Sequence, residues 1–87
     1  MTHNTQEQVD NLLILMLQNG VLSGADLSDA DLSSANLMGV NLTGADLSEA
    51  DMSMTLLRNT DLRKANLSKA ELHGARYDSQ TRWTDLS

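Results

Sequence analysis

A large apolar residue recurs at every fifth position over the central sixty residues of this chain. A small or β-branched residue always stands two places earlier, as in Ala25-Asp26-Leu27. The residue between the two is usually Asp, Asn or Glu. The twelve large residues, here called the anchors, are Leu22, Leu27, Leu32, Leu37, Leu42, Leu47, Met52, Leu57, Leu62, Leu67, Leu72 and Tyr77.

Neither an α-helix nor a flat β-strand keeps a period of five on one face. Five residues advance a helix by about 140° beyond a full turn, so the anchors would be scattered around its surface. On a flat strand, an odd step sends successive anchors to opposite faces. The anchors can stay on one side only if the chain turns a corner within each five-residue unit.

The fifth position of each unit is the natural place for such a corner. Four of the five glycines occupy it, and glycine adopts the backbone conformations that tight turns need. Because residues that do not favour turns also stand there, we expect that a positive φ is not required at every corner. Those residues are Glu49, Met54, Lys64 and Lys69.

The tandem motif Ala-(Asp/Asn)-Leu-X-X resembles the pentapeptide-repeat family over residues 20–79, with twelve units in one register. The resemblance implies an all-β solenoid: a right-handed quadrilateral β-helix with four units per coil, and so three coils. The anchors would fill the axis, and the small residues would let the backbone close around them. Departures from the pattern at Thr55, Thr60 and Arg76 predict less regular structure on their sides.

The two ends divide the chain into three parts, residues 1–19, 20–79 and 80–87. The first part has a capping-box pattern at Thr5 and apolar residues at helical spacing, which predicts a capping α-helix over residues 6–18. In the last part the register breaks, and we expect Trp83 to cover the final coil. The segment YDSQTRW is similar to the closing segment of cyanobacterial, hence bacterial, members of the family. A finished monomer and an end-to-end homodimer remain equally open.

Composition argues against several classes of function. The net charge is −6, which disfavours nucleic-acid binding through phosphates, and the absence of cysteine excludes thiolate chemistry. The apolar run at residues 12–17 is too short to cross a bilayer and no basic segment precedes it, so we expect a cytoplasmic protein without membrane association. Neither histidine, His3 or His73, accompanies a nucleophile, so we expect no enzyme and no catalytic, cofactor or metal site.

Four units per coil would put every fourth unit on the same face of the solenoid. We number the faces by the units that they contain. Face one holds residues 20–24, 40–44 and 60–64; face two holds 25–29, 45–49 and 65–69; face three holds 30–34, 50–54 and 70–74; face four holds 35–39, 55–59 and 75–79.

Charge is unequally divided among these faces. Faces two and three carry seven acidic residues against one lysine, a net charge of −6, whereas faces one and four carry four cations against two acids, a net of +2. The acidic positions either satisfy backbone groups and aid solubility or form a docking face for a basic protein surface. The candidate contact residues are Asp26, Asp31, Asp46, Asp51 and Glu71.

We therefore expect a non-enzymatic scaffold that acts through contacts with a protein partner which the sequence does not identify. The alternative is a DNA-mimic inhibitor or protector of a topoisomerase, because some longer members of the family imitate duplex DNA. Three coils would rise only about 14 Å, the length of about four base pairs. Those relatives also favour phenylalanine anchors, and this chain has no phenylalanine.

Overall fold

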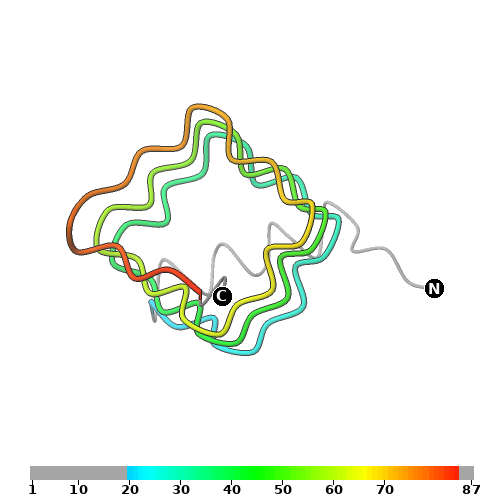
Figure 1. Ribbon diagram of the computed structural model, residues 1–87, viewed down its shortest axis with the longest axis horizontal. Coiled ribbons are helices and arrows are strands. Elements are labelled where there is room, and N and C mark those ends of the chain that lie inside the picture. The colour runs from blue at the N-terminus through cyan, green and yellow to red at the C-terminus, as the bar shows by residue number, and fades with distance from the viewer. Residues whose placement is uncertain (1–19, 85–87) are drawn as a thin grey trace.

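The computed structural model describes residues 20–84, which form three stacked quadrilateral coils around one axis (Figure 1). The coils turn in the right-handed sense that parallel crossover connections take in proteins of L-amino acids. Within the described residues there is no helix and no continuous strand, only isolated bridges. The capping helix predicted over residues 6–18 lies outside the described residues.

Parallel backbone pairing joins each coil to the next between residues twenty positions apart. Asp26 pairs with Asp46, and Asp46 pairs with Asn66. The N–H of Asp46 donates to the carbonyl of Ala25 at 2.9 Å, and the carbonyl of Asp46 accepts the N–H of Leu27 at 2.8 Å. Each bridge is one residue long because the chain turns a corner directly after it.

Every corner from residue 24 to residue 74 has the hydrogen bond and the backbone angle of a type II turn. The N–H of Ala25, for example, donates to the carbonyl of Leu22 at 3.0 Å, and the corner residue, Gly24, has a φ of 71°. A positive φ recurs at all the corner positions from 24 to 74. The last corner of the third coil, closed by the N–H of Thr81 donating to the carbonyl of Asp78 at 3.1 Å, has no residue with a positive φ. The prediction that not every corner requires one is therefore confirmed at this corner and wrong at the four residues for which it was made. The residues expected to be exceptions have φ of 60°, 61°, 62° and 60°: Glu49, Met54, Lys64 and Lys69.

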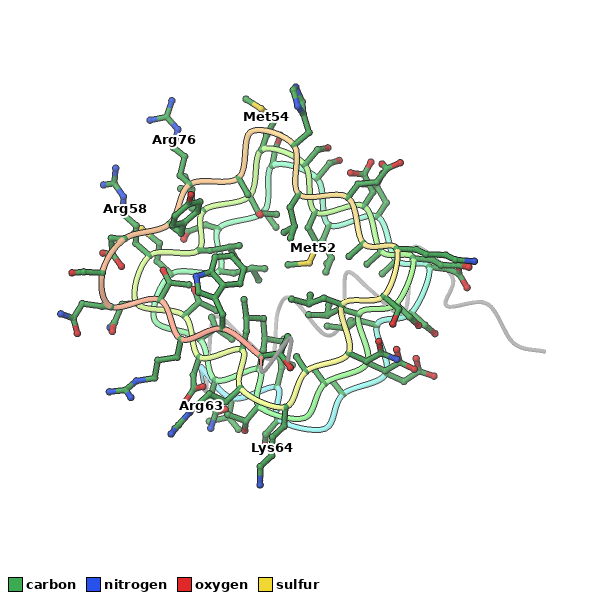
Figure 2. All side chains as sticks on the ribbon, viewed as in Figure 1. Met52, Met54, Arg58, Arg63, Lys64 and Arg76 are labelled. Atoms are coloured by element: carbon green, nitrogen blue, oxygen red, sulfur yellow. The ribbon has the colours of Figure 1, made fainter. Side chains whose placement is uncertain are left out.

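The axis of the solenoid is filled as predicted. The anchors from Leu22 to Leu62 are buried, and Met52 points toward the axis (Figure 2). The small residues Ala45 and Ala50 have no accessible surface, which confirms their inward position. There is therefore no room along the axis for a larger side chain at these two positions.

The predicted irregularity at Thr55, Thr60 and Arg76 is wrong. The hydroxyl of Thr55 donates to the carbonyl of Met52 at 2.8 Å, and that of Thr60 donates to the carbonyl of Leu37 at 2.7 Å. Both threonines are fully buried. The backbone of Arg76 forms its parallel bridge like the other units. A buried hydroxyl is tolerated in the small position because it donates a hydrogen bond to a backbone carbonyl.

The third coil ends with one extra residue. Asp61 pairs with Arg82, twenty-one positions on instead of twenty. Thr81 then takes the buried small position, and its hydroxyl lies 2.8 Å from the carbonyl of Leu57. Asp78 Oδ1 accepts the N–H of Asn59 at 3.1 Å. The pairing thus continues past residue 79, where the sequence predicts the array to end.

Tyr77 differs from the other anchors. Its side chain is 63% exposed, so its assignment as a buried anchor is wrong. Its ring meets the ring of Trp83 edge-on, with the ring centres 5.4 Å apart. Leu67 and Leu72, the last two leucine anchors, are only partly buried against the core, since none of the described residues forms a fourth coil.

Candidate protein-contact site

The structure arranges the five candidate contact residues in two neighbouring columns, here called the acidic columns. Asp26 pairs with Asp46 on face two, and Asp31, Asp51 and Glu71 pair in succession on face three. Successive carboxylates therefore lie about 4.8 Å apart along the axis. All five belong to residues directly before an anchor, whose side chains point away from the core.

The aspartates in these columns each commit one oxygen to their own turn. Asp31 Oδ1 accepts the backbone N–H of Ser33 at 3.1 Å and its hydroxyl at 2.6 Å. Asp51 Oδ1 makes the same pair of bonds to Ser53, at 3.0 and 2.6 Å. The hydroxyl of Ser33, followed by its N–H, holds the pKa of Asp31 below its ordinary value. Sequence analysis offers two explanations for the acidic positions, and one of them is that they satisfy backbone groups. These hydrogen bonds fulfil that role.

Asparagine makes the same bonds elsewhere in the solenoid, so the turn does not need a carboxylate. Asn41 Oδ1 accepts the N–H and hydroxyl of Thr43 at 3.0 and 2.7 Å, and Asn66 binds Ser68 at the same distances. Like charges stacked in neighbouring strands repel one another. The turn therefore accounts for an oxygen acceptor at this position but does not require that the acceptor carry a negative charge.

Cations project from the opposite side of the solenoid. Arg58 and Arg76 extend from face four, and Arg63 and Lys64 extend from face one (Figure 2). The extra residue in the third coil brings Arg82 beside Asp61, which adds one cation to face one and raises the net charge of faces one and four from +2 to +3. Sequence analysis missed this residue, and the signal that could have found it is the register break near Gln80.

Only one of these cations has an ion pair among the described residues. Arg63 donates from Nε and Nη2 to the two oxygens of Asp61, at 3.0 and 2.7 Å. These hydrogen bonds lower the pKa of Asp61 and raise that of Arg63. Arg63 and Lys64 also line an open hollow of about 400 Å³ with Thr43 and Gly44. The paired guanidinium contributes little free positive charge there.

The described residues offer no obvious alternative chemistry. Within residues 20–84, no three His, Asp or Glu side chains come together where they could hold a metal ion. The same part of the chain has no helix that is long and apolar enough to cross a membrane. His73 is exposed on face three. The outward charged faces are therefore the candidate site.

Comparison with known proteins gives a consistent picture. A family model described as pentapeptide repeats matches residues 16–44 and 41–76. The solved structure of Rfr23, a pentapeptide repeat protein of the cyanobacterium Cyanothece 51142, is 35% identical with a TM-score of 0.63, over 72% of this chain and 46% of Rfr23. HetL of Nostoc sp. strain PCC 7120, involved in heterocyst differentiation regulation, is 34% identical with a TM-score of 0.62, over 64% of this chain and 27% of HetL. The chain thus spans less than half of either protein, and no curated protein sequence matches it.

Proposed function

The chain belongs to the pentapeptide-repeat family, and we propose that it is a non-enzymatic scaffold that acts through protein–protein contacts. One observation carries this proposal: charge is segregated on opposite sides of a solenoid whose backbone groups pair from coil to coil. Faces two and three carry −6, whereas faces one and four with Arg82 carry +3. The regulatory role of HetL is compatible with a member of this family acting by contact.

The acidic columns are the proposed docking surface for a basic protein partner. Asp31 and Asp51 are held in place by their own turns through Oδ1. Their second oxygens make no hydrogen bond to the described residues and can accept one from a lysine or arginine. Because these side chains are fixed before binding, the partner meets an ordered row of carboxylates at a low cost in side-chain entropy.

The test removes the charge of one column and keeps its turns. Asp31→Asn, Asp51→Asn and Glu71→Gln together leave an oxygen acceptor at both turns, as Asn41 and Asn66 do naturally. We expect stability to hold or to rise by a few tenths of a kcal/mol per relieved pair, while capture of basic proteins by the immobilised chain falls. The matched control is Asp61→Asn, on the basic side.

Two results would contradict the docking surface. Capture by the triple variant that equals wild type at low salt would leave the acidic columns without a binding role. Lower thermal stability with unchanged capture would give the carboxylates a purely structural role.

The acidic columns also support the alternative of a DNA-mimic inhibitor or protector of a topoisomerase. Its weakness is length, because three coils rise only about 14 Å against about 3.4 Å for each base pair. A supercoiling assay with a bacterial type II topoisomerase separates the two functions. Inhibition or protection that disappears in the triple variant would favour the mimic, and an unaffected enzyme would favour the scaffold.

The remaining parts of the proposal follow from the scaffold role. It includes a protein partner whose identity is open, no binding of nucleic acid or membrane, and a cytoplasmic location. The proposed oligomeric state is a monomer or an end-to-end homodimer. Sedimentation velocity distinguishes these two states directly.

A further inference from the structure

Face four and its corner with face three combine exposed apolar side chains with arginines that form no ion pair with the described residues. Met38 is 47% exposed and Met54 is 53% exposed, and Tyr77 is the most exposed large apolar residue. The group, here called the methionine–arginine patch, consists of Met38, Met54, Leu56, Arg58, Arg76 and Tyr77.

Backbone pairing brings these residues together from three coils. Leu56 forms a parallel bridge with Arg76. The N–H of Gly39, next to Met38, donates to the carbonyl of Arg58 at 3.1 Å, so Met38 lies one coil below Arg58. The two arginines project outward from the same face (Figure 2).

Met54 borders the patch at the corner between faces three and four (Figure 2). Its thioether occupies the space that a Cβ at Gly74 would need, so the side chain lies along the corner toward the third coil. The apolar surface of Met54 is thereby held beside the face that carries the arginines.

The positive charge of the patch is available because face four is poor in acids. Arg58 and Arg76 form no ion pair with the described residues, in contrast to Arg63, which is held by Asp61. The acid on this face, Asp78, forms no ion pair with Arg58 or Arg76 and turns one oxygen toward the backbone. Its Oδ1 accepts the N–H of Asn59 at 3.1 Å and that of Gln80 at 3.0 Å. Burial opposes ionisation of Asp78, but these N–H groups outweigh it and lower its pKa.

We infer that the methionine–arginine patch binds an acidic protein segment that also carries apolar side chains. Arginine, methionine and tyrosine are the residues enriched at protein interfaces, and arginine grips carboxylates through two parallel hydrogen bonds. Methionine adapts its shape to irregular apolar partners. A phosphate or a nucleic acid would engage the arginines alone and leave the methionines exposed.

This inference rests on the proposed scaffold function and extends it. The acidic columns on faces two and three take a basic partner, and the patch on face four and its corner with face three takes an acidic one. The two surfaces lie on different sides of the same solenoid. One chain can therefore hold two partners of opposite charge at once.

The test measures binding of one defined peptide by fluorescence anisotropy. The probe is a fluorescein-labelled peptide, Glu-Glu-Leu-Glu-Glu-Phe-Glu-Glu-Leu. One control peptide has glutamine for every glutamate, and a second has serine for every leucine and phenylalanine. We expect the chain to bind the labelled probe at low salt. Both control peptides should bind at least tenfold more weakly, a difference of about 1.4 kcal/mol in binding free energy.

Variants of the full chain locate the contact. Arg58→Gln with Arg76→Gln should weaken binding by about tenfold or more. Met38→Ser with Met54→Ser should weaken binding of the probe by about fivefold. The chain already has serine at the same two positions of another repeat unit, Ser33 and Ser34. The matched control, Arg63→Gln with Lys64→Gln, removes the same charge from face one and should leave the affinity within about twofold. Thermal melting verifies that each variant is folded.

Several outcomes would overturn the inference. These are no binding of the probe up to about 1 mM, an equal loss in the face-one control, equal binding of the serine peptide, and displacement of the probe by a short single-stranded oligonucleotide. The triple variant of the acidic columns should bind the probe as wild type does. Failure of the patch therefore leaves the docking role of the acidic columns standing, and failure of the columns leaves the patch standing.

Discussion

Replacing Gly44 by alanine should destabilise the solenoid even though nothing crowds the added methyl group. A Cβ at this position would meet no atom within 4 Å, and the φ of Gly44 is +70°. Holding an L-residue in the left-handed region costs about 1–2 kcal/mol. Relative to glycine, alanine lowers the conformational entropy of the unfolded chain, which offsets about 0.4–1 kcal/mol of this cost. We expect a net loss of about 1 kcal/mol in the free energy of unfolding.

The same corner offers the reverse experiment one coil further on. Lys64 has a φ of 62°, so Lys64→Gly should relieve the strain and raise the free energy of unfolding by about 1 kcal/mol. Lys64→Ala keeps a Cβ in the same backbone conformation and serves as the control, with a change within about 0.5 kcal/mol.

Urea and thermal denaturation followed by circular dichroism measure all three variants. A change of about 1 kcal/mol corresponds to about 4–8 °C in Tm for a domain of this size. D-alanine at position 44, introduced by chemical synthesis, should stabilise the protein because a positive φ suits it. Stability of Gly44→Ala equal to or above wild type, or a loss in Lys64→Gly, would refute the argument from corner strain.

Three further predictions concern the core and the turns. Ala45→Leu should cost about 1–3 kcal/mol because the axis has no spare room, and melting like wild type would contradict the inward position of Ala45. Thr60→Val removes a 2.7 Å hydrogen bond to the carbonyl of Leu37 and should cost about 1 kcal/mol; Val40, one coil below, shows that valine fits. The Tm should fall as the pH drops below about 4, because carboxyls with a lowered folded-state pKa stabilise the fold above their unfolded-state pKa and lose that contribution as they are protonated. These carboxyls are Asp31, Asp61 and Asp78, and a Tm that stays constant down to pH 3 would contradict their role.

The period of five predicted a chain that turns in every unit, and the resemblance to pentapeptide repeats implied the quadrilateral solenoid with the anchors on its axis. A repeat that fits neither a helix nor a flat strand leaves few alternatives to a chain that turns in every unit. The inward positions of Leu47 and Ala45, which that resemblance implied, are confirmed by the burial of both side chains. Thr55 and Thr60 were harder to place, because a core tolerates a threonine only where its hydroxyl can donate a hydrogen bond to an acceptor such as a carbonyl. That partner comes from the fold and not from the local sequence.

The corners and the end of the array were predicted less well, for physical reasons. Local preference assigns Glu49 and Met54 to an ordinary backbone conformation, but the stacked coils place both in the same turn as the other corners from 24 to 74. The many backbone hydrogen bonds between coils therefore outweigh the strain at single residues. Near Tyr77, the count of five still places the backbone of Arg76 correctly but not the side chain of Tyr77. One inserted residue moves Arg82 onto face one and leaves Tyr77 exposed.

The five positions of the repeat have different structural roles, and the candidate surfaces are built from the positions that point outward. The anchor, the small residue and the corner determine the fold. The residue before the anchor needs no negative charge: Asp51 and Asn41 make the same turn bond, and Leu56 forms its bridge without a side-chain oxygen. The residue after the anchor also points outward. Arg58 and Arg76 occupy these two different positions in different coils, so only the coil register reveals that they are neighbours. Because charge at these outward positions can change without breaking a turn or filling the axis, variants on either surface can alter binding while the solenoid stays folded.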